Sequence, residues 1–136
     1  LFNLPSLDSI DIDTENAVHI SPENIVDNPH LKELNLYEIK YVYKYSFDDR
    51  REIKIGDIAE ILNKFTALER LIIRTQGISD LSFVQYMPDL SYIDISDNYV
   101  QDISPLVGLT NLKVVVCPKN QIANVSLLND TVTVLR

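Results

Sequence analysis

Two aspartates near the start of the chain are the side chains whose type and spacing best suit chemistry. Asp11 and Asp13 alternate with apolar residues, so on a strand both carboxylates would point to the same face. Paired carboxylates can hold a calcium ion, or can act as a general acid and a general base. No glycine-bearing calcium loop accompanies them, which favours a solvated acidic face over a metal or catalytic site.

Few other side chains in the sequence could serve as ligands, bases or nucleophiles. The chain has two histidines, His19 and His30, and one cysteine, Cys117. His30 falls in a predicted turn where polar residues recur, and Cys117 falls in a position that is otherwise apolar, which predicts a buried, unreactive thiol. There is no phosphate-binding glycine loop and no nucleophile motif. The sequence therefore predicts no catalytic residue, no metal site and no cofactor, and indicates a protein that is not an enzyme.

The elements that would position these side chains follow a repeat of 22 residues between Leu68 and Asp130. Leu68, Leu90 and Leu112 occupy the same position of successive repeats, and the apolar and asparagine positions that follow them keep the same offset. The pattern is Leu-x-x-Leu-x-Leu-x-x-Asn-x-Ile, in which residues two apart share one side of a short strand. One such coil cannot bury its apolar side alone, so successive coils are expected to stack.

This pattern resembles that of leucine-rich repeats, whose period is roughly 20 to 29 residues. Segments such as DISPLVGLTNLKVV, from Asp102 to Val115, resemble the 22-residue class found in bacterial internalin-like surface proteins. The resemblance implies an α/β fold, namely a right-handed leucine-rich-repeat solenoid with a parallel β-sheet on its concave face and short helices or 3-10 turns on its convex face. It also implies the binding of other macromolecules.

The repeat divides the chain into coils that we expect to form a single domain over residues 1–136. Their expected bounds are about 7–30, 31–67, 68–89, 90–111 and 112–133. In the first coil Glu15 stands where the repeat has asparagine. The last coil is expected to close near Asp130, and Val134 to begin a further strand.

The second coil is longer than the others, and we expect an insertion at about residues 39–55. Tyr41, Tyr43 and Tyr45 alternate with other residues, and a polar turn and a second alternating run follow them. This arrangement predicts a β-hairpin, with a single longer strand and a loop as the alternative. From Asp57 to Phe65, an N-cap aspartate and helical spacing predict a helix that leads back to the repeat.

The net charge of −8 is distributed unevenly along the chain. Residues up to Glu38 include eight acidic side chains against Lys32 alone, whereas the rest include twelve acidic and eleven basic ones. Nucleic acids and anionic membranes require basic surfaces, so neither is the expected partner. No apolar run is long enough for a membrane helix, so we expect no membrane insertion within this segment. The acidic end either steers a basic partner or only maintains solubility.

Stacked coils would align the residues between the buried strand positions into columns on the concave face. Tyrosine and arginine often dominate interface energies, although aromatic and β-branched residues also simply suit strands. The tyrosine-rich insertion is the preferred centre of binding, unless its tyrosines fill the core where the repeat is interrupted. The predicted protein-binding residues are Tyr37, Tyr41, Tyr43, Tyr45, Arg70, Ile72, Arg74, Tyr92, Asp94, Val114 and Val116.

These features favour a non-catalytic module that recognises another protein, and a bacterial cell-surface or secreted location is preferred. An intracellular regulator or inhibitor of an enzyme would use the same surface, so it stays an alternative. A structural spacer or self-association element is a third possibility. Leu1 is not a methionine, so the presence of flanking repeats is left open.

Overall fold

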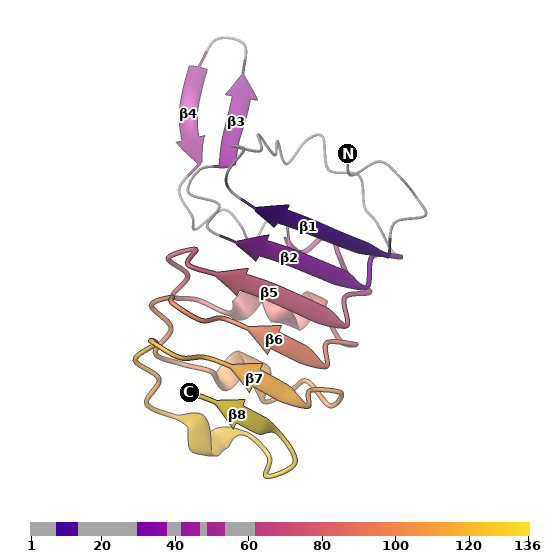
Figure 1. Ribbon diagram of the computed structural model, residues 1–136, viewed down its shortest axis with the longest axis vertical. Helices are drawn as coiled ribbons and strands as arrows, with labels where there is room; N and C mark the ends of the chain where they lie inside the picture. The colour runs from indigo at the N-terminus through magenta and orange to yellow at the C-terminus, as the bar shows by residue number, and fades with distance from the viewer. Residues whose placement is uncertain (1–7, 14–29, 38–41, 47–48, 54–61) are drawn as a thin grey trace.

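The structure is a computed structural model that describes residues 8–13, 30–37, 42–46, 49–53 and 62–136. The described residues form a six-stranded sheet in the order β1-β2-β5-β6-β7-β8 (Figure 1). Each strand pairs in parallel with the next. The strands are β1 (Ser9–Asp13), β2 (Glu33–Tyr37), β5 (Arg70–Arg74), β6 (Tyr92–Asp94), β7 (Val114–Val116) and β8 (Thr133–Leu135).

The register of the central strands follows the 22-residue period. Arg70 lies opposite Tyr92, and Tyr92 lies opposite Val114. The segments beginning at Leu68, Leu90 and Leu112 therefore lie side by side as parallel strands, which confirms the stacking predicted from the repeat.

The last strand departs from the period. Thr133 lies opposite Val114, which is 19 residues earlier (133 − 114). Val134 is therefore the middle residue of β8, beside Val115, and the expectation that it begins a strand is wrong by one residue. The return segment is shortened because Leu128, directly after the last 3-10 helix, is already extended, whereas Val107 at the same point of the preceding coil is helical.

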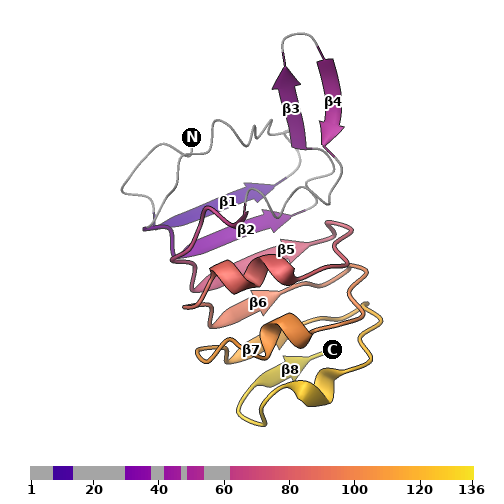
Figure 2. The ribbon, with the colours of Figure 1, turned by 180° about the vertical axis from the view of Figure 1, so that it is seen from behind.

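Within the described residues, three short 3-10 helices cover one face of the sheet, which Figure 2 shows from behind. A carboxylate precedes each of the first two helices. Asp80 accepts hydrogen bonds from the backbone N–H and the hydroxyl of Ser82, and Asp102 accepts the same two bonds from Ser104. The helices are η3 (Ser82–Tyr86), η4 (Ser104–Leu106) and η5 (Val125–Leu127), in agreement with the 3-10 turns expected on the convex face.

The core lies between the sheet and these helices and consists of the apolar positions of the repeat. In the central coils these side chains are almost fully buried, as are Leu62 and Phe65 ahead of β5. Cys117 is 3% exposed in its predicted core position, and burial raises the pKa of its thiol. After Cys117 the apolar residues that pack against the core are only partly buried, namely Ile122, Val125, Leu128, Val132 and Val134.

A buried asparagine after β6 joins neighbouring coils. The Oδ1 atom of Asn98 accepts hydrogen bonds from the N–H groups of Gln76 and Ile78, both at 3.0 Å. The amide therefore pairs backbone groups that the turn leaves outside the strand ladder. Asn120 binds the backbone in the same way one coil later. The Nδ2 atom of Asn98 donates to the carbonyls of Ile73, Ile95 and Ser96.

Two further strands, β3 (Val42–Ser46) and β4 (Asp49–Ile53), form a separate antiparallel pair. Val42 lies opposite Ile53, and Ser46 lies opposite Asp49. Both strands fall within the range of the expected insertion. Residues 38–41, 47–48 and 54–61 lie outside the described residues, and the last of these ranges includes residues 57–61 of the expected helix.

Candidate protein-binding surface

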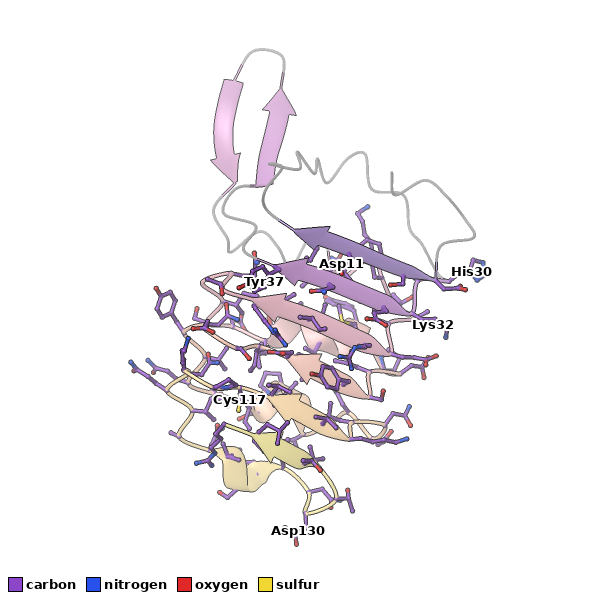
Figure 3. The ribbon with its side chains drawn as sticks, viewed as in Figure 1. Asp11, His30, Lys32, Tyr37, Cys117 and Asp130 are labelled. Atoms are coloured by element: carbon purple, nitrogen blue, oxygen red, sulfur yellow. The ribbon has the colours of Figure 1, made fainter. Side chains whose placement is uncertain are left out.

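The side of the sheet that faces away from the 3-10 helices is the predicted concave face, and we call it the open sheet face. Its residues alternate with the buried positions of each strand. Figure 3 shows Tyr37 at the carboxyl end of β2, with His30 and Lys32 at the opposite end. The open sheet face comprises Asp11, Glu33, Asn35, Tyr37, Arg70, Ile72, Arg74, Tyr92, Asp94, Val114, Val116, Thr133 and Leu135.

A partly buried ion pair joins the carboxyl ends of β5 and β6. The Nε and Nη2 atoms of Arg74 lie 2.7 and 2.5 Å from Oδ2 of Asp94. The other carboxylate oxygen, Oδ1, accepts hydrogen bonds from the backbone N–H of Ser96 at 3.0 Å and from its hydroxyl at 2.5 Å. The side chain of Asp94 is 0% exposed and that of Arg74 is 43% exposed. Because both carboxylate oxygens are engaged, the guanidinium is held in one orientation.

This ion pair also affects the charge state of its arginine. The hydrogen bond to Asp94 raises the pKa of Arg74, and the nearby Tyr92 and Tyr37 raise it further. The guanidinium thus stays charged under all ordinary conditions. Removing Arg74 alone would leave Asp94 as a buried charge without a cation, which is strongly destabilising.

Arg70, at the other end of β5, is held by more exposed partners. Its guanidinium carbon lies 3.6 Å from the centre of the Tyr92 ring, and its Nε lies 3.4 Å from Oε1 of Glu33. Both side chains of the ion pair with Glu33 are about two-fifths exposed, at 39% and 43%. Exposed pairs of this kind contribute about 0 to 1 kcal/mol, and a cation over an exposed ring about 0.5 to 1 kcal/mol. Arg70 is therefore held less firmly than Arg74.

Two residues that the alternation predicts to be exposed are buried. Ile72 is 8% exposed and Asp94 is 0% exposed, so the expectation that both face solvent is wrong. Asp94 lies opposite Ile72 in the register, and the Arg74 side chain reaches across this row to bind the carboxylate. A long side chain laid over the sheet therefore removes the row beneath it from water.

The other predicted binding residues within the described side chains stay accessible. Tyr37 is 39% exposed, and the two arginines, Tyr92, Val114 and Val116 are partly exposed. Leu135 on β8 lies opposite Val116 and is 51% exposed, which extends the apolar end of the open sheet face. The repeat gave no signal for Leu135, because the last coil departs from the period. Tyr41 lies outside the described residues, as do the side chains of Tyr43 and Tyr45.

The structure describes some of the chemical groups considered from the sequence, while the side chain of Asp13 lies outside the described residues. No three His, Cys, Asp or Glu side chains there gather closely enough to hold a metal ion. Asp11 is exposed on β1, and His30 is exposed in the turn before β2. No helix among the described residues is both long enough and apolar enough to cross a membrane. His19 lies outside the described residues.

Comparison with known proteins finds similarity to solved structures. No protein-family model and no curated protein matches the sequence. The crystal structure of an internalin C2 from Listeria monocytogenes str. 4b F2365 is similar, with a TM-score of 0.40 and 15% sequence identity. The match covers 81% of this chain, which spans 62% of the length of that one. Similarity at this level does not indicate a function.

The architecture follows instead from features of the chain itself. Parallel strands recur at the 22-residue period, a buried asparagine binds the backbone of adjacent coils, and 3-10 helices cover one face of the sheet. These are the features expected of a leucine-rich repeat. The described part of the chain is therefore built as a leucine-rich-repeat solenoid.

Proposed function

We propose that the protein is a non-catalytic recognition module that binds another protein through the open sheet face. The observation that carries the proposal is the composition of that face. Partly exposed Tyr37, Tyr92 and two arginines lie beside the apolar Val114 and Val116. Buried interface centres are enriched in tyrosine and arginine and depleted in other charged residues.

The size of the sheet supports a binding surface that extends beyond it. Six strands at about 4.8 Å spacing give a width of about 24 Å. Strands of three to five residues give a length of about 10 to 17 Å. The resulting area falls short of the roughly 800 Å² that one partner contributes to a standard interface.

We therefore include the segment at about residues 39–55 in the binding surface, as a β-hairpin inserted into the second coil. Tyr41, Tyr43 and Tyr45 belong to it, and the antiparallel pairing of β3 with β4 supports the hairpin. The proposal takes residues 1–136 as one domain of five coils, with the bounds expected from the repeat. A bacterial cell-surface or secreted protein is the proposed setting, on the resemblance of the repeat alone.

Affinity capture with the intact chain, followed by mass spectrometry, would identify the partner, and alanine variants would then test the surface. We expect Tyr92→Ala and Tyr43→Ala each to weaken binding by more than about 1 kcal/mol, since both residues are proposed as anchors. Tyr86→Ala is the matched control, because Tyr86 is 48% exposed on η3 at the opposite face. Unchanged affinity of both test variants, with the fold intact, would refute the proposal.

A further inference from the structure

Among the described residues, Arg74 uses one side of its guanidinium. Its Nε and Nη2 atoms both donate to the same oxygen of Asp94. A guanidinium has five N–H donors, and none of the hydrogen bonds found in the described part of the chain involves Nη1. The side chain is 43% exposed, so the unused donors are accessible from the open sheet face.

The orientation of this guanidinium is fixed before any partner binds. Asp94 is fully buried, and Ser96 holds the carboxylate oxygen that does not contact Arg74. Arginine side chains normally lose conformational freedom on binding, at a cost of about 0.5 to 1.5 kcal/mol for each immobilised side chain. At Arg74 most of that freedom is already lost on folding, which makes the residue a preorganised anchor.

The surroundings of Arg74 determine what it can bind. Ile72, which is almost fully buried, precedes it by two residues on β5, and Tyr37 lies opposite Arg74 in the register of β2 with β5. Val114 and Val116 lie two strands away on β7, at about 10 Å from β5. A planar cation in such a partly apolar setting matches a carboxylate in charge and geometry.

We infer that Arg74 receives the carboxylate of an aspartate or glutamate of the partner, and that apolar residues next to this acid pack on Val114 and Val116. The inference rests on the proposed function and specifies the partner's chemistry. It also gives the bound segment a direction. The acid lies over β5, where Arg74 is, and the apolar residues lie over β7, where Val114 and Val116 are. This direction keeps the acid about 10 Å from the exposed Asp11 on β1, beyond the screening length of about 8 Å in physiological salt. On β2, next to β5, the carboxylate of Glu33 pairs with Arg70.

Random peptides displayed on phage and selected against the intact chain provide the probe. The strongest binder would be synthesised together with a copy in which amides replace its carboxylates. We expect the acidic peptide to bind at least about tenfold more tightly than the amide copy. Binding of the acidic peptide should weaken in Tyr92→Ala and Val116→Asp, which places it on the open sheet face.

Arg74→Gln alone would leave the buried Asp94 without a cation and could unfold the protein. The informative variant is therefore the double change Arg74→Gln with Asp94→Asn. This neutral pair keeps hydrogen-bonding groups of similar size, and thermal unfolding would establish that it folds. We expect it to bind the acidic peptide and the amide copy equally. Lys119→Gln, at an exposed cation that pairs with Asp97 outside the open sheet face, is the matched control and should keep the preference for acid.

The possible failures are distinguishable. Peptides that bind the open sheet face without a preference for acid, or with a preference that survives the double variant, would overturn the assignment of Arg74 while the proposed function stands. Selected peptides whose binding is unaffected by Tyr92→Ala and Val116→Asp would show that the open sheet face is not the recognition surface, and both proposals would then fall.

Discussion

The residue directly before the asparagine position adopts a left-handed backbone conformation in three successive coils, and one of these residues is poorly suited to it. Thr75, Asp97 and Lys119 have φ values of 57°, 57° and 59°, each directly before the asparagine position of the repeat. Only Thr75 is β-branched, and a left-handed conformation is a genuine outlier for such a residue. The neighbouring coil holds this turn in place, because the Thr75 N–H donates a hydrogen bond to the carbonyl of Ser96. The strain is therefore tolerated.

Replacing Thr75 with asparagine should therefore stabilise the protein. Thr75 is exposed, so the substitution Thr75→Asn loses no buried contact, and asparagine adopts the left-handed region more readily. We expect the free energy of unfolding in a urea titration to rise by about 0.5 to 1 kcal/mol. Thr75→Val, which keeps the β-branch, is the control and should bring no gain. An unchanged or lower stability for Thr75→Asn would contradict the assignment of strain.

The buried asparagine after β6 should be among the most sensitive positions of the chain. Asn98→Ala would leave two N–H groups and several carbonyls without partners, and each buried unsatisfied group costs about 1 to 3 kcal/mol. We expect a loss of at least about 3 kcal/mol in the free energy of unfolding. Asn120→Ala should cost less, since Asn120 is only partly buried. Equal losses at the two positions would argue against this account of the asparagine ladder.

The carboxylate that precedes η4 should contribute to stability against acid. Hydrogen bonds from the side chain and backbone of Ser104, and from Asn124, lower the pKa of Asp102 from its usual value of 3.8. A group with a lowered pKa stabilises the fold above its unfolded value and loses that contribution as the pH falls through its folded value. The stabilisation is therefore present above about pH 3.8 and fades below it.

Asp102→Asn should consequently lose less stability than the wild type as the pH falls below 3.8. Urea midpoints measured at a series of acid pH values would test this. Parallel pH profiles for the two proteins would show that Asp102 contributes nothing through its charge.

At the scale of elements, β8 should be the least stable strand of the sheet. Val115 on β7 is 0% exposed, whereas its neighbour Val134 on β8 is only partly buried. Val115→Ala should cost about 2 kcal/mol, from lost transfer energy and the cavity left behind, and Val134→Ala about 1 kcal/mol or less. Denaturant titration would compare the two variants. A larger loss of stability for Val134→Ala than for Val115→Ala would contradict this ranking of the two strands.

The elements could be predicted from the sequence wherever the period is kept. Leu68, Leu90 and Leu112 give the strands and the stacking correctly because every coil there must meet the same neighbours. The position of β8 could not be predicted, since a return segment shortened by three residues (22 − 19) leaves no mark in the repeat pattern. Helical residues after η4 and an extended Leu128 after η5 account for this difference in backbone terms.

At the scale of the whole molecule, the open sheet face could be predicted only in part. The alternation places Tyr92, Val114 and Val116 on one face correctly. Arg70 contacts Tyr92, its partner in the register 22 residues later. The pair of Arg74 with Asp94 is diagonal across the strands, with a separation of 20 residues, so the period does not reveal it. Ile72 and Asp94, which lie opposite each other, are buried, whereas Arg74 stays 43% exposed.

The central claim is that proteins are recognised on the open sheet face. Amide NMR spectra of the intact chain, recorded with and without its captured partner, test it most directly. We predict that the signals perturbed by binding come from β5 to β7, with the largest changes near Arg74, Tyr92 and Val116. Perturbations confined to η3, η4 and η5, on the opposite face, would contradict the account.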